Sequence, residues 1–197
     1  MKKVLLFILV TFFLPYSSLW AQYELKSWSF QPQAGVWFGP VAAVPGTELS
    51  RVLSTYLGGG IFGRANLPTN LFHSEVGASY NVYGRVGQEK LQVSPVYGAI
   101  DFKLPIEFAL NFYFKGGAGG SYVKNSPENH SNWLPTGFLG FETSFPAGKW
   151  VNIGLRADYY LLYEKHLKAP VDNPGMKIIN GHFINIGLML NVNILAD

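Results

Sequence analysis

The stretch GHFINIGLMLNVNI, residues 181–194, alternates between two kinds of side chain from residue 184 onward. Every second residue is aliphatic: Ile184, Ile186, Leu188, Leu190, Val192 and Ile194. The residues between them are mostly small or polar: Asn185, Gly187, Met189, Asn191 and Asn193. Successive residues of a strand point to opposite faces of a sheet. This period of two therefore predicts a β-strand with one apolar face and one polar face.

The same period recurs along most of the chain. Seven further predicted strands cover residues 29–39, 56–67, 71–85, 90–102, 105–123, 133–145 and 150–160. The predicted strand over 90–102 contains Pro95, which cannot donate a hydrogen bond to a sheet ladder. We therefore expect a bulge near Ser94 and Pro95, and assign no inward face to that strand.

The chemistry of the two faces indicates which of them points outward and which points into the interior. Charges stand singly on the polar faces, among Gly and Asn, whereas the apolar faces are large and nearly uncharged. A membrane barrel turns its apolar faces outward to lipid and its polar faces inward, and hydrocarbon cannot satisfy a free sheet edge. The sequence therefore predicts an all-β fold, a transmembrane antiparallel up-and-down β-barrel of about eight strands. The alternative is a soluble, lipocalin-like barrel with the apolar faces inside.

The charged residues assigned to the lumen are nearly balanced in sign. They are Arg64, Glu75, Arg85, Lys115, Glu142, Arg156 and Asp158. An isolated charge in a narrow interior is costly. We therefore expect these side chains to form a structural network of ion pairs that plugs the lumen.

The composition agrees with a membrane location. Aromatic residues make up 16% of the chain and charged residues only 14%, against about 25% charged in soluble domains. The formal net charge falls from +3 to +1 without Lys2 and Lys3, and no cluster of basic residues predicts a nucleic-acid partner. Since the chain has no Cys, it has no disulfide, thiolate metal site or lipoprotein anchor.

The N-terminus has the pattern of a secretory signal. Lys2 and Lys3 precede an apolar run over 4–14, and Ala21 supplies a small residue at the expected cut. The run is shorter than the roughly 20 apolar residues of a membrane-spanning helix. We therefore predict a signal peptide over 1–21 and a single barrel domain over 22–197.

The predicted links between strands are unequal in length. Every second link is short: residues 68–70, the region around 103–105, and residues 146–148. The others are mostly longer and polar: residues 40–52, 86–89, 124–132 and 164–180. Aromatic residues fall near predicted strand ends: Trp28, Trp133, Trp150, Tyr159 and Tyr163. Short periplasmic turns, longer outer loops and aromatic girdles are typical of outer-membrane barrels.

Two segments carry a resemblance to a family. EVGASY, residues 75–80, and GLRADYY, residues 154–160, are similar to strands of small outer-membrane β-barrel proteins, typified by the OmpX-like barrels and the OmpA membrane domain. The resemblance covers 22–197 and implies a place in the outer membrane of a Gram-negative cell. Members of this porin family usually end in an aromatic residue that the assembly machinery reads, whereas this chain ends in ILAD, residues 194–197.

Candidate catalytic groups do not converge in the sequence. His73, Ser74 and Glu75 suggest a hydrolase, but neighbouring strand residues point to opposite faces. His130 and Ser131 are one residue apart in a predicted loop, whereas outer-membrane lipid deacylases use a His and a Ser two residues apart on one strand face. Residues 116–120 are glycine-rich without a following helix, so they predict close strand packing rather than a phosphate loop. We expect no catalytic, cofactor or metal site.

The leading functional hypothesis is a non-enzymatic barrel with a structural or surface-interaction role. Its expected partners are outer-membrane lipids and lipopolysaccharide, the outer-membrane assembly machinery, and an extracellular or membrane protein that meets the loops. The second hypothesis is a lipid-modifying enzyme, an acyltransferase or lipid A deacylase, for which the lipid-facing polar residues are Ser74 and Thr143. The third is a small pore, disfavoured because side chains fill an eight-stranded barrel.

Two pairings follow from keeping lumen-facing residues opposite lumen-facing residues. A turn centred between Thr69 and Asn70 places Arg64 directly opposite Glu75. A three-residue turn over 146–148, with Gly148 in a left-handed conformation, pairs Phe145 with Lys149, and so places Glu142 opposite Asn152.

Overall fold

The computed structural model describes residues 30–47, 49–51, 53–68, 71–85, 90–106, 109–126, 130–163 and 180–195. These residues form nine strands and one short 3-10 helix: β1 Pro32–Ala43, η1 Leu49–Arg51, β2 Leu53–Ser54, β3 Tyr56–Asn66, β4 Phe72–Arg85, β5 Lys90–Lys103, β6 Asn111–Ser126, β7 His130–Pro146, β8 Val151–Leu162 and β9 Gly181–Asn193. The predicted signal peptide, residues 1–21, lies outside the described residues.

Within the described part of the chain, no helix is both long enough and apolar enough to cross a membrane.

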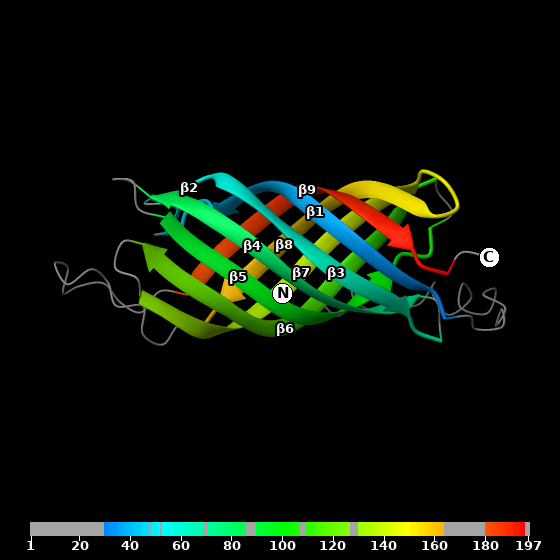
Figure 1. Ribbon diagram of the computed structural model, residues 1–197, viewed down its shortest axis with the longest axis horizontal. Helices are drawn as coiled ribbons and strands as arrows, with labels where there is room; N and C mark the ends of the chain where they lie inside the picture. Colours follow the sequence, from blue (N-terminus) through cyan, green and yellow to red (C-terminus); the bar gives the residue numbers. More distant parts are fainter. Residues whose placement is uncertain are drawn as a thin grey trace, which may run out of the picture.

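The eight long strands close into one antiparallel barrel. From β3 to β9 each strand pairs with its neighbour in the sequence, and β1 closes the ring by pairing with both β3 and β9. Figure 1 shows the strands inclined to one long axis and wrapped around it. This confirms the predicted all-β, up-and-down barrel of about eight strands. Closure leaves no long strand with an unpaired edge, which is the condition for a sheet in hydrocarbon.

Alternation along each strand decides which side chains face outward. In β9, Leu188 is 68% exposed, whereas its neighbours on the other face, Asn185 and Met189, are 1% and 2% exposed. The same division holds in β4, where Val76 is 67% exposed and Glu75 is buried. The large apolar faces therefore lie on the outside of the barrel. This is the predicted arrangement, and the opposite of a lipocalin-like soluble barrel.

The β5 strand runs through Pro95 without a change of register. Its pairing with β6 is continuous along its whole length, and its offset from β4 is the same before and after Pro95. The expected bulge near Ser94 and Pro95 is therefore wrong. The β4–β5 ladder is interrupted around Pro95, where the proline has no N–H to donate. As a result, the odd-numbered residues of β5, among them Tyr97 and Asp101, face inward.

A bulge lies instead between β2 and β3. Ser54 pairs with Gly84 of β4, and Gly58 pairs with Asn81. From Ser54 to Gly58 the chain thus advances by four residues, while β4 advances by three from Gly84 to Asn81. One extra residue therefore lies near Thr55. The bulge reverses the faces, so that Leu53 is buried in the lumen while Tyr56 is 48% exposed on the outer surface.

The predicted bounds of β6 and the predicted start of β7 are wrong. The strand expected over 105–123 begins at Asn111, because the chain leaves the sheet near Pro105. There the amide of Leu104 donates to the carbonyl of Phe112, and Ile106 donates back to Leu104. At the other end, β6 and β7 extend to Ser126 and His130, so the long link expected over 124–132 shortens to residues 127–129.

The predicted turn between β7 and β8 is also wrong. Pro146 pairs with Asn152, and the amide of Ala147 donates to the carbonyl of Val151. Five residues, 147–151, therefore lie between the last paired residues, two more than expected. Gly148 does not adopt a left-handed conformation. The longer turn keeps the inward faces together but shifts Glu142 to a place opposite Arg156.

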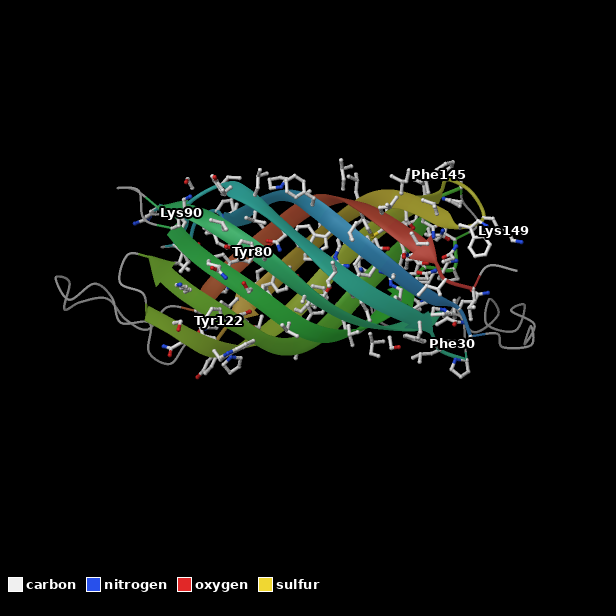
Figure 2. The ribbon with its side chains drawn as sticks, viewed as in Figure 1. Phe30, Tyr80, Lys90, Tyr122, Phe145 and Lys149 are labelled. Carbon is white, nitrogen blue, oxygen red and sulfur yellow. The ribbon has the colours of Figure 1, made fainter. Side chains whose placement is uncertain are left out.

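The two ends of the barrel differ in their connections. We call the end with the β3–β4, β5–β6 and β7–β8 links the turn end. The opposite end, with the links that leave β1, β4, β6 and β8, is the loop end. Figure 2 shows Phe30, Phe145 and Lys149 at the turn end, and Tyr80, Lys90 and Tyr122 toward the loop end.

Candidate functional site: a charged network in the lumen

Six strands send charged side chains into the lumen at one level of the barrel. We call these side chains the charged network: Arg64 of β3, Glu75 of β4, Asp101 of β5, Lys115 of β6, Glu142 of β7, and Arg156 and Asp158 of β8. Each of them is at most 3% exposed. Alternation brings them to the inner face, and the strand register brings them to one level.

The Arg64–Glu75 pair has the register that the sequence predicts. The two residues are direct partners in the β3–β4 ladder. Both Nε and Nη2 of Arg64 donate to Oε2 of Glu75, at 3.2 and 2.8 Å. The predicted cross-strand opposition is confirmed.

Ion pairs also cross the lumen between strands that are not neighbours. Nη1 of Arg64 donates to Oε1 of Glu142 at 3.0 Å, which joins β3 to β7. Nη2 of Arg156 donates to Oε1 of Glu75 at 2.8 Å, which joins β8 to β4. Lys115 donates to Glu75 at 3.0 Å and also pairs with Glu142. The side chains of opposite walls therefore meet across the lumen.

Asp101 belongs to the charged network, although the sequence analysis did not assign it. Its Oδ2 lies 2.7 Å from Nε of Arg64, and its partner across the β5–β6 ladder is Lys115. Because a bulge was expected at Pro95, the sequence analysis assigned no inward face to this strand and so did not place Asp101 in the lumen. The alternation of Ile100 and Phe102 with Asp101 is the signal that could have found it.

Aromatic rings pack against the charged groups. Three cations lie near the ring of Phe62: the guanidinium carbons of Arg64 and Arg156 are 5.3 and 4.8 Å from its centroid, and Nζ of Lys115 is 5.3 Å away. The hydroxyl of Tyr97 donates to Glu75 at 3.0 Å. Such contacts favour cations in a desolvated site.

The structure brings together six of the seven lumen residues that the sequence assigned. Arg85 is the exception. It is the last residue of β4 and pairs through its backbone with Leu53, but its side chain lies outside the described part of the structure.

Toward the loop end, the inward side chains form an apolar layer. Its members are buried or partly buried hydrophobic residues: Val41, Leu49, Leu53, Leu91, Val93, Val123, Leu134, Leu162 and Phe183. Eight residues line a cavity of about 30 Å³ within it, and apolar cavities stay dry. The inward side chains thus form two successive levels, the charged network and this apolar layer.

The candidate catalytic residues do not assemble into a site. His73 and Glu75 face the lumen, whereas Ser74 faces outward with its hydroxyl 3.5 Å from the Ala65 carbonyl. Thr143, the other lipid-facing candidate, has no hydrogen-bond partner among the described atoms. No group of three or more His, Asp or Glu residues in the described ranges has the geometry to hold a metal ion.

Two other histidines of the chain lie on β7 and β9. The side chain of His130 lies outside the described part of the structure. His182 contacts the Tyr159 hydroxyl through Nδ1 at 2.6 Å.

Comparison with solved structures finds small outer-membrane barrels. Neisserial surface protein A superposes with a TM-score of 0.57 at 8% identity, over 83% of this chain and 96% of that one. The N-terminal β-barrel domain of Pseudomonas aeruginosa OprF gives a TM-score of 0.51 at 11% identity, over 84% of this chain and 99% of that domain. No family model and no curated protein matches the sequence. The chain has the fold of small outer-membrane β-barrels, and at these identities the likeness concerns the fold alone.

Proposed function

We propose that the chain is a non-enzymatic barrel of a Gram-negative outer membrane, with a structural or surface-interaction role and a lumen closed to ions. The observation that carries this proposal is the division of side chains between the two faces. The outer face is apolar around the ring, and the lumen holds ion pairs that reach from wall to wall.

The outer surface supports a place in lipid. Ile61, Val76 and Leu188 are each more than 60% exposed on the outside of the barrel. In water such a surface would be a large contiguous apolar patch, which soluble monomers avoid. In a bilayer the same side chains meet hydrocarbon. Exposed Trp133 and Trp150 lie near strand ends, where aromatic girdles meet the headgroups.

The lumen supports a closed barrel rather than a pore. The charged network spans the interior from β3 to β7 and from β4 to β8. The apolar layer then occupies the lumen toward the loop end. An ion would have to displace buried ion pairs and then enter a dry layer, and both steps are costly.

The lipid-facing residues favour a non-enzymatic role. Chemistry on a membrane lipid needs a nucleophile and a base that reach the same bond. On the outer face Ser74 and Thr143 stand apart, and His73 faces the lumen instead. The proposed partners are therefore outer-membrane lipids, the assembly machinery, and a protein that meets the loop end.

Cell fractionation followed by planar-bilayer recording tests the proposal. We expect the protein in the outer-membrane fraction, and no stable conductance from the folded, reconstituted barrel. Recovery as a soluble periplasmic species would contradict the membrane location. Steady stepwise currents would contradict the closed lumen.

A further inference from the structure

A groove lies on the outer face of the barrel near its loop end. Its volume is about 330 Å³, and six side chains line it: Tyr56, Tyr80, Val82, Lys90, Gln92 and Lys124. We call it the loop-end groove. Figure 2 places Lys90 and Tyr80 toward this end of the barrel, with Tyr122 nearby on the same side.

The strand register builds the floor of the groove. Gln92 of β5 is the direct partner of both Val82 of β4 and Lys124 of β6, so three neighbouring outward side chains form one row across the sheet. The hydroxyl of Tyr80 donates to Oε1 of Gln92 at 3.4 Å, which ties the next row to it. The groove therefore rests on paired strands rather than on a loop.

The bulge near Thr55 supplies the groove with an aromatic wall. Without the extra residue, Tyr56 would share the inward face with Gly58. With it, Tyr56 lies on the outer surface, where Nζ of Lys90 is 5.8 Å from the ring centroid. Bulges commonly re-aim a side chain in this way.

The two lysines of the groove differ from the cations of the lumen. Arg64, Lys115 and Arg156 each have a carboxylate within ion-pair distance. Among the described residues, neither Lys90 nor Lys124 has a carboxylate within 4.0 Å. Within the described ranges, two ammonium groups without a carboxylate partner therefore line a groove that also holds two tyrosines, at the boundary of an apolar belt.

We propose that the loop-end groove binds the phosphate group of an outer-leaflet lipid. The inference rests on the proposed place of the barrel in a membrane. The lysines hold the phosphate, because a long lysine side chain extends its charge from an apolar surface to the headgroup level. The tyrosines lie at the headgroup boundary, and outward residues farther from the loop end, such as Val96, contact the acyl chains. This position on the outer wall favours a lipid over a soluble phosphate.

Lipid retention by the folded protein in neutral phosphatidylcholine nanodiscs tests the proposal. The probe is bisphosphorylated lipid A, with its dephosphorylated form as the matched lipid. The variant Lys90→Gln/Lys124→Gln removes both charges and keeps side chains of similar length. Lys149→Gln is the control variant, because Lys149 also lies near an aromatic ring, that of Trp150 at 6.0 Å, but at the turn end.

We expect the double variant to retain about 25-fold less bisphosphorylated lipid, since each lysine near a membrane surface contributes about fivefold. Lys149→Gln should retain as much as the wild type, and the dephosphorylated lipid should not distinguish the three proteins. Equal retention by the wild type and the double variant would overturn the proposal. Displacement of the lipid by 10 mM inorganic phosphate would overturn the choice of a lipid and indicate a general phosphate site.

The same experiment separates this inference from the proposed function. Insertion of the folded barrel into nanodiscs is measured first, by its faster gel migration before heating. Failure to insert contradicts the membrane location itself. Insertion without a difference between the variants contradicts only the groove. The single variants Lys90→Gln and Lys124→Gln keep the test decisive if the double variant does not fold.

Discussion

Within the charged network, two carboxylates of similar burial have very different surroundings. Glu75 accepts hydrogen bonds from Arg64, Lys115, Arg156 and Tyr97. Among the described side chains, Asp101 forms an ion pair only with Arg64, and neither of its oxygens accepts a hydrogen bond. We predict that Glu75→Gln lowers the free energy of unfolding by about 3 kcal/mol, as expected when a buried ion pair loses one partner. Asp101→Asn should change it by less than about 1 kcal/mol, because Arg64 keeps two carboxylates.

Urea unfolding in lipid vesicles, followed by tryptophan fluorescence, measures both changes. The two substitutions match each other, since each replaces a carboxylate by its amide. Equal losses would mean that the number of contacts does not decide the contribution of a buried carboxylate here.

At the scale of the element, the glycines of β6 explain how two strands pack closely. A Cβ on Gly117 would overlap the carbonyl oxygen of Gly98 across the ladder, whereas a Cβ on Gly116 would meet nothing closer than a Leu139 methyl at 3.8 Å. We predict that Gly117→Ala destabilises the barrel by about 1–3 kcal/mol through this overlap. Gly116→Ala should be neutral or stabilising by less than about 1 kcal/mol, because alanine restricts the unfolded chain.

The same urea titration compares the two variants, which differ only in the face that the added methyl group occupies. A loss at Gly116 as large as the loss at Gly117 would show that strand flexibility, rather than close approach, requires the glycines.

At the scale of the whole molecule, closure determines the resistance to unfolding. β9 joins β1 to β8, so every long strand has two partners. We predict that the folded protein resists SDS at room temperature and migrates faster on a gel before heating than after. The hydrogen-bonded ring has no strand edge at which detergent-driven unfolding begins. A chain ending before Gly181 should lack the faster form, because β1 and β8 lose their shared partner. A truncated chain that keeps the faster form would contradict the role of closure.

The sequence alone determined the approximate positions of the strands, the faces of most of them, and one register. A period of two is a local property, so the outward face of β9 and the inward position of Glu75 could be read without the fold. The Arg64–Glu75 pairing was also predictable, because their strands are joined by a short turn. A slip of one residue is excluded there, since it would place lumen-facing residues opposite lipid-facing ones.

The tertiary structure decided what depends on distant strands or on the shape of a link. A three-residue turn between β7 and β8 and a turn two residues longer both keep lumen-facing residues opposite each other. Only the structure therefore places Glu142 opposite Arg156. Asp101 joins the charged network because the ladder continues through Pro95. The contacts of Arg64 with β7 and of Arg156 with β4 exist only after closure. Alternation tells which face a residue occupies, whereas the curvature of the closed sheet sets which residues meet across the lumen.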